Sequence, residues 1–222
     1  MSVAGGSAAR QAAALRARAR RGVWRRVTAW LGWNPAARRA DAVAARWVIG
    51  GEAEQATARI LAPLETAGWT ILHDRALPGS RANLDHVLLS PCGTAAVVLD
   101  TKRWHAGKTT SLVRGRVHCG FPGRYRQADD RHRQVEAVAS YAGRVSGLLG
   151  VPVWPLLVVH GSRIDGGRLE VRVTGWVGVV HVLGPDWLVP TLAAAPAGRD
   201  RVRAAALAAR AVRVLPRYGG RG

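Results

Sequence analysis

The stretch TAAVVLDTK, residues 94–102, decides how this sequence folds. Its middle is a near-continuous apolar run, which is typical of a central strand buried on both faces. The run ends in Asp100 and Lys102. Because side chains alternate along a strand, these two point to one face of the sheet, and Thr101 points to the other. An apolar strand that closes with an acid and a lysine on one face indicates a functional site at its end.

The preceding segment, LDHVLLS (84–90), is also strand-like, and a turn at 91–93 separates the two. A turn this short predicts antiparallel pairing, with residue 88 or 89 opposite residue 95 or 96. The same count brings Asp85 close to Asp100. Two carboxylates and a lysine are therefore expected to converge at one edge of the sheet.

These three side chains suit phosphate chemistry. Two close carboxylates repel, so the pKa of one rises unless a cation neutralises them. Oxygen ligands without thiolates favour Mg²⁺ or Mn²⁺ over Zn²⁺. Such a cation can bridge a scissile phosphate and a water, while Lys102 stabilises charge on the phosphate or assists the attacking water. The alternative is that Asp85 is a strand-edge carboxylate and Asp100–Lys102 a surface ion pair.

The flanking segments predict the order helix, three strands, helix, strand. The first helix is expected from Asp41 to Ala67, with a break at Gly50-Gly51 and a kink or stop at Pro63. A second helix is expected from Asp129 or Asp130 to about Leu149. The remaining expected elements are strands at 69–74 and 151–160, a hairpin at 109–119, strand-like runs at 169–173 and 177–183, and two Ala-rich helices at the end.

An ordered set of short motifs now stands out. It comprises Gly51-Glu52, Asp85-His86, Asp100-Thr101-Lys102 with Trp104 and Gly107 after them, and Gln134 on the second helix. In this order, over about residues 50–160, the sequence resembles the nuclease-related domain (NERD) family of the PD-(D/E)xK, restriction-endonuclease-like superfamily. The resemblance implies an α+β fold with an α-β-β-β-α-β core, in which helices flank a mixed central sheet. It also implies Mg²⁺-dependent phosphodiester hydrolysis.

The resemblance also assigns roles to residues. It makes Asp85 and Asp100 metal ligands, Lys102 the catalytic lysine, Glu52 an accessory ligand and Gln134 a supporting residue. Many members of the superfamily have Glu where this chain has Asp100, and the shorter side chain changes the metal geometry.

Two of these assignments have competing interpretations. Helical spacing with Ala56, Ile60 and Leu64 predicts that Glu52 faces the core; alternatively, Glu52 only favours a helix N-terminus after Gly51. Gln134 sits one turn before Val138, at the edge of the buried stripe. Gln127 competes with it for this position, and Gln134 could also be a solvated helix residue.

The composition narrows the class of protein. The chain has 222 residues, of which 48% are apolar, so it can build a core and is not disordered throughout. No apolar run reaches the roughly 18 residues that a membrane span needs. Two cysteines are too few for a disulfide scaffold, which favours a reducing compartment such as the cytoplasm.

The net charge of +19 is concentrated at the two ends of the chain. Residues 1–40 carry nine Arg and no acid, and residues 199–222 carry seven Arg and one Asp. Residues 41–198 hold 17 basic and 13 acidic residues, a balance of only +4. We therefore expect a nuclease-like domain at 41–198, flanked by a basic N-terminal extension (1–40) and a basic C-terminal tail (199–222).

The N-terminal extension interleaves tryptophan with arginine: Trp24, Arg25, Arg26, Trp30 and Trp33. The segment could be a solvated helix docked through its tryptophans. It could instead contact nucleic acid, with Arg on phosphates and Trp on bases. A membrane-surface helix is the weaker alternative, because the apolar face is short. The acid-free start also resembles an organellar transit peptide, but Ser is not enriched.

These observations favour a metal-dependent nuclease acting on DNA rather than RNA. Arg25, Arg26, Arg103 and Lys108 are the candidate nucleic-acid contacts. The alternatives are a non-catalytic nucleic-acid-binding protein on the same fold, and a peripheral membrane or interaction protein that uses the Trp/Arg extension. The sequence does not indicate an oligomeric state.

Overall fold

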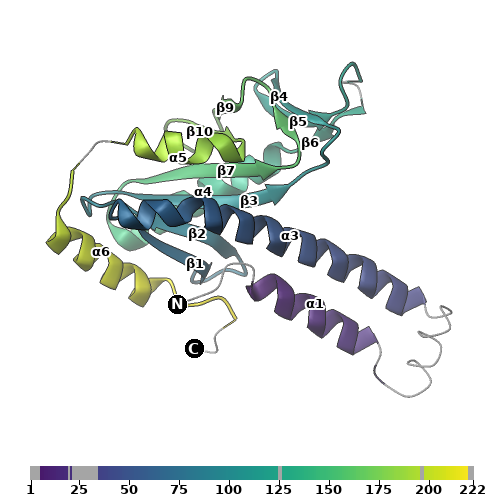
Figure 1. Cartoon of the computed structure of the whole chain (residues 1–222), viewed down its shortest axis with the longest axis horizontal. Helices are drawn as coiled ribbons and strands as arrows, with labels where there is room; N and C mark the ends of the chain where they lie inside the picture. Colours follow the sequence, from purple (N-terminus) through teal and green to yellow (C-terminus); the bar gives the residue numbers. More distant parts are fainter. Residues whose placement is uncertain (1–5, 20, 22–34, 125–126, 196–197, 220–222) are drawn as a thin grey trace.

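The structure is a computed structural model that describes residues 6–19, 21, 35–124, 127–195 and 198–219 (Figure 1). Its helices are α1 (Gly6–Ala19), α3 (Pro35–Thr66), α4 (His132–Leu149), α5 (Pro185–Ala193) and α6 (Arg201–Val214). Its strands are β1 (Thr70–Ala76), β2 (Asn83–Leu89), β3 (Ala96–Arg103), β4 (Thr109–Val113), β5 (Arg116–Gly120), β6 (Asp129–Asp130), β7 (Val153–His160), β8 (Arg163–Ile164), β9 (Arg168–Val171) and β10 (Val180–Leu183).

A six-stranded mixed sheet, ordered β1-β2-β3-β7-β10-β9, forms the centre of the fold. The first three strands form an antiparallel meander, and β7 and β10 then lie parallel to β3. The crossover from β3 to β7 runs through α4, as a parallel connection requires. The expected α-β-β-β-α-β core is therefore confirmed, as is the α+β class with its mixed sheet.

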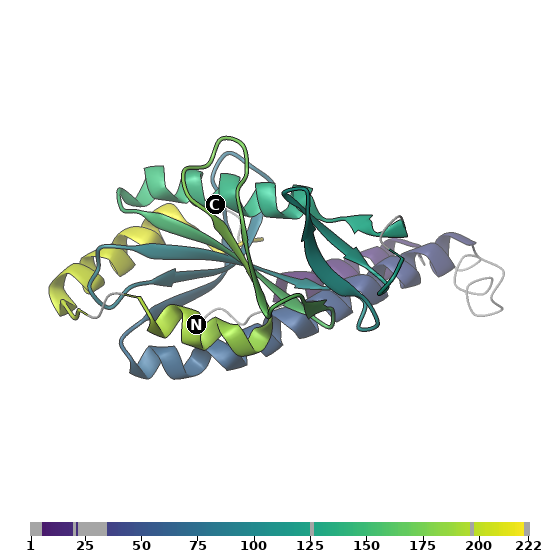
Figure 2. The same ribbon diagram turned by 90° about the horizontal axis from the view of Figure 1, so that it is seen from above.

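Helices cover both faces of this sheet (Figure 2). On one face α4 and α6 pack their apolar stripes against β2, β3 and β7, and on the other face α3 and α5 do the same. Along β3 the two faces alternate: Val98 packs toward α4, whereas Val97 and Leu99 pack toward α3. This alternation explains why the strand reads as a continuous apolar run.

A second, four-stranded sheet, ordered β6-β5-β4-β8, extends from the end of β3. The wing formed by β4, β5 and β6 closes over Trp104 through Val117 and Cys119, which are buried with it in the core on the α4 side. The expected hairpin at 109–119 is confirmed by β4 and β5. Strands β6 and β8 are two residues each and were not expected.

The expected break at Gly50-Gly51 is wrong, because α3 runs unbroken for 32 residues and includes Pro63 near its end. Each glycine in a helix interior costs about 1 kcal/mol relative to alanine. Burial of Ala44 and Ala53 on either side offsets that cost. The helix therefore continues across residue 41, where the sequence suggests a domain boundary.

The ends of the described chain pack on the domain. Helix α1 lies along α3 (Figure 1), and the Arg16 guanidinium pairs with the Asp41 carboxylate at 3.6 Å. Helix α6 buries Leu207 and Ala211 in the core on the α4 side. Beyond α6, the backbone N–H of Ala76 in β1 donates to the carbonyl of Pro216 at 2.8 Å. None of the described helices is long and apolar enough to cross a membrane.

Candidate active site

The site is built at the carboxyl end of β3. Leu89 pairs with Ala96 and His86 with Leu99, so the predicted register of β2 and β3 is confirmed. The turn between them needs Gly93, whose φ is +68°, because a Cβ there would lie 2.3 Å from the carbonyl carbon of Arg203. Continuing this register places Asp85 opposite Asp100, as expected from the length of the turn.

The three predicted side chains do converge. The buried carboxylate of Asp85 accepts a hydrogen bond from the backbone N–H of Thr101 at 2.8 Å. The Lys102 ammonium lies 2.5 Å from the Asp100 carboxylate. Asp100 and Lys102 lie on the face covered by α4, and Thr101 lies on the α3 face, where its hydroxyl donates to that of Thr57 at 3.2 Å. The alternation predicted for residues 100–102 is therefore confirmed.

Electrostatics at this edge are dominated by burial and like charge. Burial raises the pKa of Asp85 well above its usual range, and the neighbouring Asp100 carboxylate raises it further. Burial alone would lower the pKa of Lys102, but Asp100 and Asp85 together outweigh it and raise that pKa above its ordinary value. Lys102 is therefore an ammonium at neutral pH, held beside two carboxylates that repel each other.

Helix α3 presents a different glutamate from the one expected. Glu52 is exposed, so the prediction that it faces the core is wrong. Glu52 and Leu64 are twelve positions apart, which turns them about 120° from each other around the helix axis. The buried stripe instead runs through Ala53, Thr57, Leu61 and Leu64.

Glu54 flanks that buried stripe and is the glutamate that acts on the site. Its charge raises the pKa of both Asp85 and Lys102. Reading the helical phase from Thr57 and Leu61 instead of Ile60 would have identified Glu54 from the sequence. The role of Glu52 as an accessory ligand rests on the family resemblance alone.

Gln134 lies where the stripe of α4 predicts, partly buried at the first turn of the helix. Its side-chain carbonyl accepts a hydrogen bond from the indole N–H of Trp104 at 3.2 Å. The Arg131 guanidinium lies 5.6 Å from the centroid of the same indole. Gln134 therefore anchors the segment that follows Lys102, instead of pointing alone into solvent.

His86 belongs to the core. It is fully buried on the α3 side, and its Nδ1 lies 2.8 Å from Nδ1 of His73 on β1. Burial lowers the pKa of His86 to about 3, so the ring is neutral. No three His, Cys, Asp or Glu side chains within the described ranges are arranged to hold a metal ion.

The candidate nucleic-acid contacts differ in their surroundings. Arg103 is exposed directly after Lys102, and none of the ion pairs among the described residues involves it. The Lys108 ammonium instead pairs with the Asp129 carboxylate at 2.7 Å, and Arg131 pairs with the same carboxylate at 3.1 Å. Arg25 and Arg26 lie outside the described residues, as do Trp24, Trp30 and Trp33.

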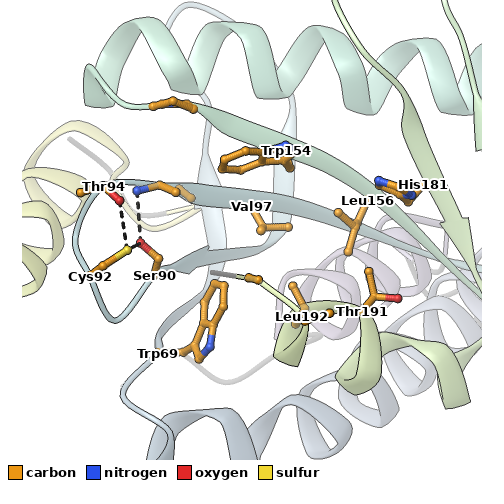
Figure 3. A pocket seen from close by; sticks show the side chains of 15 residues that line it. Trp69, Ser90, Cys92, Thr94, Val97, Trp154, Leu156, His181, Thr191 and Leu192 are labelled. Carbon is orange, nitrogen blue, oxygen red and sulfur yellow. Dashed lines mark hydrogen bonds between the residues drawn. The ribbon is translucent and has the colours of Figure 1, made fainter. Parts of the chain in front are cut away.

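A cavity of about 490 Å³ lies at the opposite end of β3 (Figure 3). Its lining includes Trp69, Val97, Trp154 and Leu192, with Cys92 at one side. The hydroxyl groups of Ser90 and Thr94 lie 3.2 and 3.0 Å from the Cys92 sulfur and lower the pKa of the thiol to about 7. The described residues that line this cavity include no carboxylate. This cavity is therefore separate from the site of Asp85 and Asp100, where phosphate chemistry is expected.

Comparison with known proteins agrees with this architecture. The family model described as the nuclease-related domain, NERD, matches residues 49–160, half of the chain. The chain belongs to the NERD family. No curated protein and no solved structure matches it.

Proposed function

We propose that this protein is a metal-dependent nuclease that hydrolyses phosphodiester bonds of nucleic acid, with DNA preferred to RNA. The observation that carries the proposal is the convergence of Asp85, Asp100 and Lys102 at the end of a buried strand. A purely structural role would not favour a buried carboxylate beside a second one, because the pair raises the pKa of Asp85 and costs stability. Such an arrangement is typical of functional sites.

The donors at this edge fit a hard divalent cation, Mg²⁺ or Mn²⁺. Asp85 and Asp100 would hold it, with Glu54 or Glu52 as the accessory acid from α3. One or two carboxylates suffice, because Mg²⁺ usually completes its shell with waters and substrate phosphates. A bound cation would relieve the repulsion between the carboxylates and stabilise the charge that develops on the phosphate.

The residues around the cation would each have a separate role. Lys102 is cationic and one-third exposed, so its ammonium can donate to a phosphate oxygen. Thr101 orients Asp85 through its backbone N–H. Gln134 holds Trp104 and thereby the chain that leaves the site. Arg25, Arg26 and Arg103 would add sequence-independent affinity for phosphates, as would Lys108 if it left Asp129.

Cleavage assays test this proposal directly. Supercoiled, linear and single-stranded DNA and RNA are incubated with the protein in Mg²⁺, Mn²⁺ or EDTA. Cleavage is expected with either cation and not with EDTA, and to be abolished in Lys102→Ala and Asp100→Asn. Arg203→Ala is the matched control, because it removes one member of an exposed ion pair on α6.

Two outcomes would contradict the proposal. If both site variants cut as well as the wild type, the assigned residues are wrong. If the protein binds nucleic acid but cuts none of the substrates, it is a non-catalytic binding protein on a nuclease fold.

A further inference from the structure

An exposed aromatic pair includes His105, which follows Lys102 by three residues. The rings of His105 and Phe121 meet edge to face, with centroids 5.5 Å apart and an interplanar angle of 68°. Phe121 is the chain's only phenylalanine, and 44% of it is exposed. The Lys108 ammonium lies 5.3 Å from the centroid of the Phe121 ring.

Phe121 directly follows β5, and its exposure departs from the pattern of that strand. Val117 and Cys119 are buried, and strict alternation along β5 would bury Phe121 as well. The strand ends at Gly120, where a Cβ would lie 2.7 Å from the Cβ of Ala128, so no side chain fits there and the alternation stops before Phe121. Trp104 takes the buried place beneath the wing.

His105 lies close to Lys102 along the chain. His105 follows Lys102 by three residues, so their Cα atoms are at most about 11 Å apart. Gly107 lies close to both rings, because a Cβ there would lie 3.3 Å from the His105 ring and 3.5 Å from the Phe121 ring. A base attached close to a phosphate held by Lys102 would therefore lie near the His105 side of the pair.

Ion pairs partly neutralise the charge around the aromatic pair. Lys108 and Arg131 share the Asp129 carboxylate, and Arg116 pairs with Asp130 at 2.7 Å. Two carboxylates thus face three of these cations, and Arg103 beside Lys102 belongs to none of the ion pairs among the described residues. This part of the wing therefore offers ring surface in addition to positive charge.

We propose that His105 and Phe121 form a stacking platform for an unpaired base next to the scissile phosphate, so that the substrate is single-stranded nucleic acid. Bases inside a duplex are stacked and paired, and their faces are closed to a protein ring, whereas an unpaired base presents its face. Stacking of this kind tolerates any sequence, because every base has such a face. The inference rests on the proposed function for the neighbouring site.

Binding without cleavage tests the platform. Affinities of a labelled single-stranded oligonucleotide and a blunt duplex of equal length are measured by fluorescence anisotropy in EDTA. Phe121→Ala is expected to weaken single-strand binding about 5- to 100-fold, as removal of one stacked base predicts, and to change duplex binding less than about twofold. Phe121→Trp should retain the affinity.

The wing supplies matched controls. Leu112→Ala and Val113→Ala remove exposed apolar side chains from β4 and should leave both affinities unchanged. An oligonucleotide with abasic sites should bind the wild type as weakly as the intact strand binds Phe121→Ala. The platform is wrong if Phe121→Ala binds single strands like the wild type, or if its duplex affinity falls equally.

The two proposals fail separately. Single-strand binding that depends on Phe121, without cleavage by the wild type, would support the platform and reject the nuclease. Cleavage that needs Lys102 but is indifferent to Phe121 would do the reverse. A wild-type protein that binds no nucleic acid would reject both.

Discussion

Thr101 donates its backbone N–H to the carboxylate of Asp85 at 2.8 Å, across the boundary between β2 and β3. A single hydrogen bond thus ties the acid of one strand to the strand that carries Asp100 and Lys102. It also partly offsets the effect of burial on the pKa of Asp85, because it favours the ionised carboxylate. The site is therefore assembled by strand pairing, before any ligand arrives.

Asp85→Asn should stabilise the cation-free protein at alkaline pH. The folded-state pKa of Asp85 is raised, so the folded protein loses stability as pH rises through that pKa and the buried carboxylate ionises. An amide carries no charge and can still accept from Thr101. Thermal unfolding in EDTA at about pH 8 should show a higher Tm, by about 2–4 °C for each kcal/mol regained.

The same variant should lose its response to divalent cations. Mn²⁺ should raise the Tm of the wild type, because a ligand that binds only the folded state stabilises it. Asp85→Asn lacks one of the two carboxylates and should show little of this increase. An equal Mn²⁺-dependent rise in both proteins would reject the two-carboxylate site.

Glu54→Gln and Glu52→Gln should separate the two glutamates of α3. Glu54 acts on Asp85 and Lys102, whereas Glu52 is exposed on the other side of the buried stripe. Removal of the Glu54 charge should lower cation affinity, measured by calorimetry, about 10- to 100-fold, as for other residues that support a metal site. Glu52→Gln should leave that affinity close to the wild-type value. If Glu52→Gln lowered cation affinity more than Glu54→Gln, Glu52 would be the accessory ligand, as the family resemblance implies.

Acid should destabilise the fold through His86. Its pKa is about 3 in the folded protein and near 6.5 in the unfolded chain, so unfolding takes up a proton between these values. Stability should therefore fall as pH drops below about 6.5, by up to about 1.4 kcal/mol per pH unit from this group. Urea unfolding of His86→Asn should show a shallower fall.

His118→Asn is the control for this measurement, because His118 is only partly buried on β5. It should leave the pH dependence of unfolding close to that of the wild type. Identical slopes for His86→Asn and the wild type would mean that His73 or another group carries the effect.

Arg103→Gln should reduce the salt dependence of nucleic-acid binding, whereas Arg116→Gln should not. Arg103 has no ion-pair partner among the described residues, and Arg116 is held by Asp130. Each phosphate that the protein no longer neutralises lowers the slope of log K against log[salt] by about 0.7 for single strands or about 0.9 for duplex. Anisotropy titrations across a salt series measure it. Equal slopes in both variants would remove Arg103 from the interface.

Features of the fold that depend on residues close together in the chain can be predicted from the sequence more readily than features that depend on distant residues. The register of β2 and β3 follows from a short turn, so the meeting of Asp85 and Asp100 is predictable. The orientation of Glu52 is not, because a stripe read at every fourth residue drifts about 40° per step around a helix. Over three steps the drift reaches about 120°, so the stripe read at every fourth residue ends at Glu52, whereas Glu54 is the glutamate that flanks the buried stripe.

The wing and its neighbouring strand β8 depend on contacts between distant residues, which the sequence does not reveal. Strand β8 pairs in parallel with β4 through only two residues, Arg163 and Ile164, across more than fifty positions of chain. A run so short has no periodicity to detect. The platform is equally hidden, since His105 and Phe121 are brought together only when β4 and β5 pair.

The unbroken course of α3 gives the molecule a fixed internal length. Glu54, which flanks the candidate site, lies thirteen positions after Asp41, the partner of Arg16 in α1, and this spacing is about 20 Å along one helix axis. A hinge at Gly50-Gly51 would have allowed α1 to move relative to Asp85. A continuous helix instead fixes the distance between them. Any ligand that bound at the α1 end would therefore lie at a set distance from the Asp85 and Asp100 carboxylates.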